Sequence, residues 1–287
     1  MLKKLLKYEW KSVFLMLAMI HVILLVYTLI GRIGLGFATG VSGETWSHSA
    51  ANVFGISAAL YILGYVLLML AAAIATFFYL AVRMQRSLFS DEGYLTHTLP
   101  VTPAKLIWSK VLIFWAWTII DFICLCLSVF LLFFSFRETF PDFFKAVAEF
   151  LNILAGSEGT EVHLMTILTI LNFLTDGIYF TFLLIFSMCL GNLFNTHKVL
   201  GTVLSFFGLN IFLTIVQTLI LLIPGMSALG SETYVTSASG LSVTVNGVPA
   251  SAQGVVPLIF SLVWSIVLSV LFFLGSRYLL SKKLNLE

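Results

Sequence analysis

Three ionisable residues interrupt long apolar stretches of the sequence: His21, Asp121 and Asp176. An ionisable group inside a membrane-spanning segment is energetically costly, and such groups line ion or proton pathways or pair with one another. No Lys or Arg lies deep enough in these stretches to pair with either aspartate. We therefore interpret the three residues as a candidate intramembrane polar pathway. In the alternative interpretation, the aspartates bond to polar neighbours: Thr118, Ser128, Asn172 or Thr175.

The composition indicates that lipid surrounds the segments that carry these residues. The 287 residues are 60% hydrophobic and 10% charged, whereas soluble domains carry about 25% charged residues. A spanning helix needs about 20 mostly apolar residues. Six stretches meet this requirement: 12–30, 56–82, 107–136, 163–190, 199–223 and 257–280. We expect an all-α polytopic membrane protein with six transmembrane helices in a single transmembrane domain over residues 1–287.

The first residues, "MLKKLLKYEWKSVF", combine an apolar face with a lysine-rich one. At helical spacing Leu2, Leu5, Leu6 and Trp10 share one face, which predicts an amphipathic interfacial helix before the first span. In the alternative, these residues are a basic flank that only sets the topology. The apolar run that follows is too long for a typical signal-peptide core, so we expect a retained span.

The basic residues predict the orientation of the chain. With the N-terminus in the cytoplasm, twelve of the fifteen Lys and Arg residues fall on the inner side, and Arg32, Arg137 and Lys145 fall outside. Inner loops of membrane proteins carry this excess of positive charge. We therefore expect both termini to be cytoplasmic, with outer loops at 31–55, 137–162 and 224–256.

Two of the outer loops have recognisable patterns. In 137–162, apolar residues recur at helical spacing between charges, which predicts a short amphipathic helix on the outer leaflet or over the extracellular mouth. In 224–256, the stretch "VTVNGVPA" alternates around Asn246-Gly247, a turn signal for a β-hairpin.

The sequence lacks the motifs of three common enzyme classes. It contains no G-x-x-x-x-G-K-[ST] phosphate loop, no H-E-x-x-H and no G-x-S-x-G. We expect no catalytic residues, no bound metal and no cofactor in this chain, and we interpret Cys124, Cys126 and Cys189 as small membrane-core residues. The net charge of +2 and the absence of a basic stripe argue against nucleic acid as a partner.

One polar segment, "RSLFSDEGYLTHTLPVTPAK" at 86–105, separates the second and third spans. Ser90 is a candidate N-cap for a short helix whose first turn is acidic. Pro100 ends that helix, and Thr102 with Pro103 begins the next. The pattern predicts a brief helical step parallel to the membrane. Its partly apolar face either dips into the lipid headgroups or docks on a partner.

The stretch "LFSDEGYLTHTLPVTPAKLIWSK" resembles permease subunits of ABC exporters of the second type, especially those of Gram-positive bacteria. The N-terminal "MLKKLLKYEWK" and the six-span layout are also similar to that family. The resemblance implies a bacterial plasma-membrane protein, and it implies that the loop between spans two and three forms a coupling helix that enters a groove on a separate ATPase. It assigns that contact to the following residues: Asp91, Glu92, Gly93, Tyr94, Leu95, Leu99 and Pro100.

These observations favour the membrane-spanning permease subunit of an ATP-driven exporter. Its partners would be two copies of an ABC ATPase, a second permease subunit that is identical or related, and membrane lipid. ATP and Mg would bind to the ATPase. The cargo would be apolar or amphipathic, with a peptide as one possibility. The alternatives are a proton-coupled secondary transporter that uses Asp121 and Asp176, and a non-transporting membrane scaffold or immunity protein.

Overall fold

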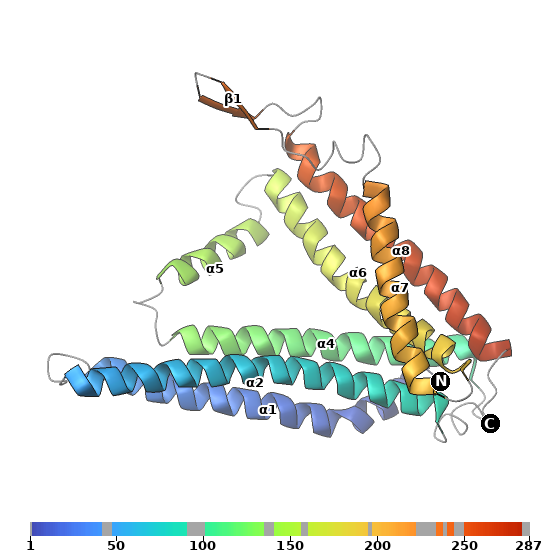
Figure 1. The fold of residues 1–287 in the computed structure, drawn as a ribbon, viewed down its shortest axis with the longest axis horizontal. Coiled ribbons are helices and arrows are strands. Elements are labelled where there is room, and N and C mark those ends of the chain that lie inside the picture. Colours follow the sequence, from blue (N-terminus) through green and yellow to red (C-terminus); the bar gives the residue numbers. More distant parts are fainter. Residues whose placement is uncertain are drawn as a thin grey trace. The chain divides into compact units, whose positions relative to one another are not determined.

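The computed structural model describes residues 2–41, 48–90, 101–134, 141–155, 160–194, 197–221, 234–237, 240–243 and 250–282. These residues form long helices and one short pair of strands (Figure 1). In chain order the elements are α1 (Leu2–Val41), α2 (His48–Phe89), α4 (Pro103–Phe134), α5 (Pro141–Leu154), α6 (Thr160–Gly191), α7 (Lys198–Leu221), β1 (Tyr234–Ser237), β2 (Gly240–Val243) and α8 (Ala250–Lys282).

Six of the helices are long and apolar enough to cross a membrane. Their apolar segments are Leu2–Gly34, Gly55–Phe89, Pro103–Phe134, Val162–Gly191, Lys198–Ile220 and Val255–Ser281. The predicted all-α polytopic fold is therefore confirmed. Positions 135–136 and 222–223 of the predicted spans lie outside the described residues, and the remainder of each predicted span falls within one of these helices.

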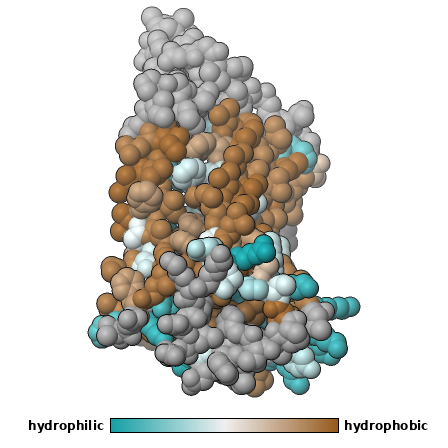
Figure 2. Space-filling model, turned by 90° about the vertical axis from the view of Figure 1, so that its right-hand side faces the viewer, coloured by the Kyte–Doolittle hydropathy of each residue, from teal (hydrophilic) through white to brown (hydrophobic). Residues whose placement is uncertain are grey.

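The surface of these helices is apolar, as a lipid environment requires. Leu15, Leu67 and Val199 are all at least 60% exposed. Figure 2 shows apolar side chains over most of the described surface on the face that it draws. In water, exposed apolar patches larger than a few hundred Å² mark binding surfaces or lead to aggregation, so lipid is the solvent that such helices fit.

The described chain divides into two compact units, residues 1–147 and 148–287. The prediction of a single transmembrane domain stays a prediction. In the first unit α1, α2 and α4 lie side by side (Figure 1). Positions 9, 21 and 28 of α1 contact positions 110, 121 and 128 of α4, so these two helices run parallel. Contacts of α2 with α1 run in the reverse order, from Arg83 against Ser12 to Tyr61 against Tyr27, so α2 is antiparallel to both.

The N-terminal amphipathic stretch does not form a separate interfacial segment. It is the start of α1, which continues without a break from Leu2 to Val41. The physical reason lies in its contacts with α4. The indole of Trp10 stacks on Trp117 with ring centroids 5.0 Å apart, and Glu9 pairs with Lys110. These contacts hold the first turns of α1 in line with the span that follows.

In the second unit α6 packs against both α7 and α8. Its C-terminal half supplies the buried core: Phe182, Leu183, Leu184, Ile185 and Met188. The turn between α6 and α7 brings Gly191 against the backbone of Thr202. Large apolar residues fill the centre of the unit, and a glycine allows its two helices to meet at one end.

The predicted outer helix is confirmed as α5, in which Phe143 and Phe144 pack against phenylalanines near the end of α4. Its position on the outer leaflet stays a prediction. The hairpin lies upstream of the predicted one. Tyr234 pairs with Val243 and Ser237 with Gly240. The predicted turn at Asn246-Gly247 lies outside the described residues.

Candidate functional site

Two of the three predicted intramembrane residues meet inside the first unit. The Nε2 atom of His21 on α1 lies 2.9 Å from Oδ1 of Asp121 on α4. The hydroxyl of Thr76 on α2 donates to the same carboxylate oxygen over 3.2 Å. His21 is 5% exposed and Asp121 is 9% exposed, so the cluster is enclosed by the three helices.

The polar neighbours predicted for Asp121 were wrong. Thr118 donates to the carbonyl of Phe114 in its own helix, and Ser128 bonds to Thr28 and Tyr65. The physical reason is helix geometry. Ser128 lies two helical turns from Asp121, too far along the helix to reach it, and the hydroxyl of Thr118 is used by the carbonyl of Phe114. His21 and Thr76 approach Asp121 from neighbouring helices instead.

A second polar layer lies two helical turns further along α1 and α4. The hydroxyl of Thr28 donates to the carbonyl of Leu24 over 2.8 Å and so accepts from Ser128, which lies 2.7 Å away. Ser128 in turn accepts from the hydroxyl of Tyr65 over 2.8 Å. The hydroxyls of Thr28, Ser128 and Tyr65 therefore all have hydrogen-bond partners, as buried polar groups require. We call the two layers together the polar seam.

Asp176 belongs to the second unit and lies on the exposed side of α6. The hydroxyl of Ser265 on α8 donates to the carbonyl of Leu262 in its own helix. The predicted neighbours point elsewhere: Asn172 donates to the carbonyls of Leu168 and Leu258, and Thr175 bonds to backbone carbonyls one turn earlier. The structure thus joins His21 to Asp121, and a pathway shared with Asp176 stays a prediction.

The predicted coupling residues, 91–100, lie outside the described residues, and so does the predicted short helix. The helices on either side are described. The backbone N–H and the hydroxyl of Ser90 both donate to the carbonyl of Arg86, so Ser90 completes the last turn of α2. After the segment, Thr102 accepts backbone bonds from Lys105 and Leu106, and α4 begins at Pro103 as predicted.

The end of the first unit next to this segment is held together by polar contacts between all three helices. The ammonium group of Lys110 on α4 pairs with the carboxylate of Glu9 on α1. The guanidinium of Arg83 on α2 donates to the hydroxyl of Ser12 on α1 over 3.0 Å. We call these four residues the proximal clamp. Lys110 is only 4% exposed, so the ion pair is largely shielded from solvent.

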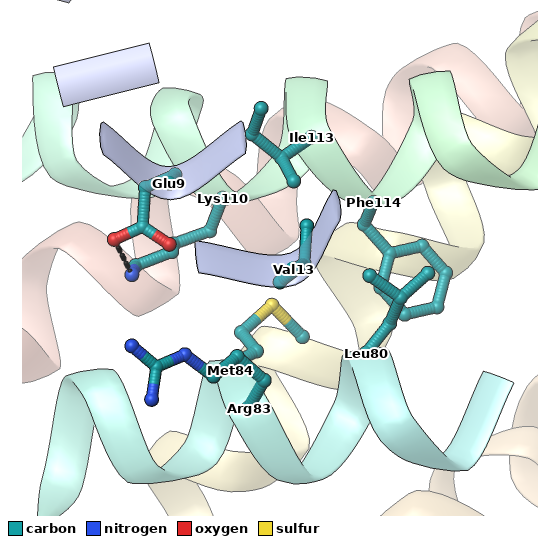
Figure 3. Close-up of a pocket in the computed structure, with 8 residues that line it drawn as sticks. All are labelled: Glu9, Val13, Leu80, Arg83, Met84, Lys110, Ile113 and Phe114. Atoms are coloured by element: carbon teal, nitrogen blue, oxygen red, sulfur yellow. Dashed lines mark hydrogen bonds and ion pairs between the residues drawn. The ribbon is translucent and has the colours of Figure 1, made fainter. Parts of the chain in front are cut away.

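Three residues of the proximal clamp, Glu9, Arg83 and Lys110, line a small cavity. Figure 3 shows the contact between Glu9 and Lys110 as a dashed line, with Arg83 and Met84 facing the pair from α2. The cavity has a volume of about 20 Å³, and its other lining residues are apolar: Val13, Leu80, Ile113 and Phe114. A cavity of this size holds a single water molecule and no larger ligand. The clamp is therefore a contact between helices and not a binding pocket.

Lys110 and Arg83 are among the twelve inner basic residues that predict the orientation of the chain, but their contacts in the proximal clamp were not predicted. A signal was present in the sequence. Glu9 is the one acidic residue in a lysine-rich start, and Lys110 is a single charge within the apolar stretch "LIWSKVLIF". A single charge of each sign at the same end of two spans is the pattern expected of a partly buried ion pair.

The cysteines and acidic residues form no metal site in the part of the chain that the structure describes. No group of three or more His, Cys, Asp or Glu side chains there is placed to hold a metal ion. Cys189 is buried in the core of the second unit, Cys124 is half-buried and Cys126 is exposed.

Comparison with protein-family models, with curated proteins and with solved structures finds no match to this chain.

Proposed function

We propose that the chain is the membrane-spanning permease subunit of an ATP-driven ABC exporter of the bacterial plasma membrane. In this proposal the segment at 91–100 forms a coupling helix that docks on a separate ATPase, which binds ATP and Mg. Two permease subunits pair with two ATPase chains, and both termini are cytoplasmic. The cargo is apolar or amphipathic, with a peptide as one candidate.

The observation that carries the proposal is the proximal clamp beside the coupling segment. The segment connects α2 to α4, and α1 is bonded to both helices through Ser12 and Glu9. A force applied to the segment would therefore act on three spans together and not on one flexible loop. ATP-driven transport by a chain without its own phosphate loop requires such a connection, because the energy source lies in another polypeptide.

The stacked pair of Trp10 and Trp117 extends this connection into the bundle. Trp117 also lies 6.2 Å from the ring of His21, so aromatic contacts link the clamp to the polar seam. Nucleotide would shift the population between two arrangements of these helices, because the ATPase binds the coupling segment differently in its two states.

Charge substitution in the coupling segment tests the proposal. Tyr94→Glu combined with Leu95→Glu is expected to weaken ATPase binding by about 30-fold or more, because aromatic and apolar anchors dominate such interfaces. The measurement is ATP hydrolysis by the complex purified through a tag on this chain, together with the amount of bound ATPase. The matched control is Leu193→Glu, an exposed apolar residue in the other predicted cytoplasmic loop, which is expected to retain the ATPase.

Two outcomes would contradict the proposal: the wild-type chain brings down no ATP-hydrolysing partner, or the double variant keeps its partner at wild-type levels. Proton flux without an ATPase in reconstituted vesicles would favour the secondary transporter. Absence of any transport in the presence of intact partners would favour the scaffold.

A further inference from the structure

The imidazole of His21 is held by oxygen atoms at both nitrogens. Its Nδ1 atom lies 2.7 Å from the backbone carbonyl of Leu17, one turn earlier in α1. A carbonyl oxygen only accepts hydrogen bonds, so Nδ1 must carry a hydrogen. The second nitrogen, Nε2, faces Oδ1 of Asp121 at 2.9 Å. The tautomer of the ring is therefore fixed by its surroundings.

This arrangement fixes the number of protons in the pair. With Nδ1 protonated, the contact between Nε2 and Oδ1 is attractive only if one more proton lies between the two atoms. The proton belongs either to an imidazolium facing a carboxylate or to a carboxylic acid facing a neutral imidazole. Both states have zero net charge. Without that proton, the lone pair of Nε2 would point at a carboxylate oxygen, which is repulsive.

The surroundings of the pair favour the neutral, proton-bound state. An uncompensated charge buried away from water carries a large desolvation penalty. From α2 the group that faces the pair is the hydroxyl of Thr76, which donates to Oδ1 and does not titrate. On α4, the half-buried Cys124 lies one helical turn from Asp121. From α1, the carbonyl of Leu17 accepts the hydrogen bond from Nδ1 of His21 and does not titrate.

We propose that His21 and Asp121 form a buried binding site for one proton, and that this proton latches α1 to α4. The ligand is a proton that His21 and Asp121 share, held at the centre of the first unit. The proposal does not rest on the proposed transport function, because it uses only the contacts among α1, α2 and α4. It differs from a proton pathway, since both residues are buried and bonded to each other.

The latch predicts how the stability of the first unit depends on pH. Separate Asp and His side chains titrate near about 3.9 and about 6.5. Above about pH 6.5 the separated groups therefore hold one proton fewer than the packed pair. By linkage, the packed state is most favoured between these two values, and the equilibrium constant for unfolding rises about tenfold per pH unit above about pH 6.5.

Asp121→Asn tests the proton count without removing the contact. The asparagine amide can donate to an unprotonated Nε2 while Nδ1 still donates to Leu17, so this variant needs no extra proton. We expect its unfolding equilibrium, measured on the full chain in lipid nanodiscs, to lose the tenfold dependence per pH unit that the wild type shows above about pH 6.5. Equal pH dependence in the two proteins would overturn the proposal.

Thr28→Val is the matched control from the second layer of the polar seam. It removes an interhelical hydrogen bond between the same two helices without removing a titratable group. We expect lower stability at every pH and an unchanged pH dependence. A change in slope as large as that of Asp121→Asn would contradict the latch, because it would show that loosening the seam alone alters the titration.

Infrared difference spectra provide a second measurement that does not depend on unfolding. Wild type minus Asp121→Asn at neutral pH is expected to contain either the band of a protonated carboxyl group or that of an imidazolium facing a carboxylate. A carboxylate band accompanied by a neutral imidazole would show that the proton is absent and would overturn the proposal.

Discussion

Replacing Gly191 with alanine is expected to prevent α6 and α7 from closing and to leave little folded protein. A Cβ atom at this position would lie 2.3 Å from the backbone nitrogen of Thr202 and 2.5 Å from its Cα. Backbone atoms cannot rotate away as the end of a side chain can. Overpacking typically costs about 1–3 kcal/mol, and we expect this clash to cost about 3 kcal/mol or more because the helices themselves must separate.

The control for this prediction is Gly208→Ala in α7. No atom lies within 4 Å of a Cβ built at Gly208. Alanine is a better helix former than glycine by about 1 kcal/mol, so this variant is expected to be as stable as the wild type or more stable. The measurement is thermal unfolding of the purified chain in detergent, followed by helix content. Equal melting temperatures for Gly191→Ala and the wild type would contradict the close approach seen at Thr202.

The positions of the spans could be predicted because a membrane imposes a strong and local rule. A run of about 20 apolar residues is enough to specify a crossing, whichever residues it later contacts. The ends of the helices could not be predicted in the same way. The first predicted span begins at Ser12, but α1 begins at Leu2. Its first turns are held against α4 because Glu9 forms an ion pair with Lys110 and Trp10 stacks on Trp117. Those contacts depend on a helix about a hundred residues away.

The candidate residues were identifiable for the same local reason. A charge within an apolar run is conspicuous, so His21 and Asp121 were singled out. Their pairing could not be derived, since it depends on which faces of α1 and α4 meet. With the structure known, the sequence contains a supporting regularity. Polar residues at 21 and 28 contact those at 121 and 128, with the same offset in both layers, as two parallel helices in fixed register require.

The hairpin shows the limit of a short turn signal. Asn246-Gly247 was chosen because Asn-Gly favours the turns that join two strands. The observed strands are Tyr234–Ser237 and Gly240–Val243, and Val243 pairs back to Tyr234. Strand pairing depends on both partners, so a turn dipeptide alone does not identify which stretches pair.

Lys110→Met is expected to loosen the start of α1 from α4 and to lower the free energy of unfolding by about 3 kcal/mol. The ammonium group is almost fully buried and contacts the carboxylate of Glu9, whose side chain is 18% exposed. Removing one member of a buried ion pair costs about 3–5 kcal/mol, because the remaining charge loses its compensation in a poorly solvated site. Because Glu9 retains some contact with solvent, we expect a value at the lower end of that range.

The double variant Glu9→Leu, Lys110→Met separates the ion pair from simple loss of packing. Replacing both charges with apolar groups of similar size is often neutral or stabilising, so the double variant is expected to recover most of the lost stability. Lys105→Met is the matched control, since Lys105 is exposed on the same helix and surface charges contribute little. Unfolding of the wild type, Glu9→Leu, Lys110→Met and the double variant in detergent, followed by tryptophan fluorescence, gives the coupling energy. Additive effects would show that Glu9 and Lys110 act separately, and the proximal clamp would then not join α1 to α4 as the proposed force transmission requires.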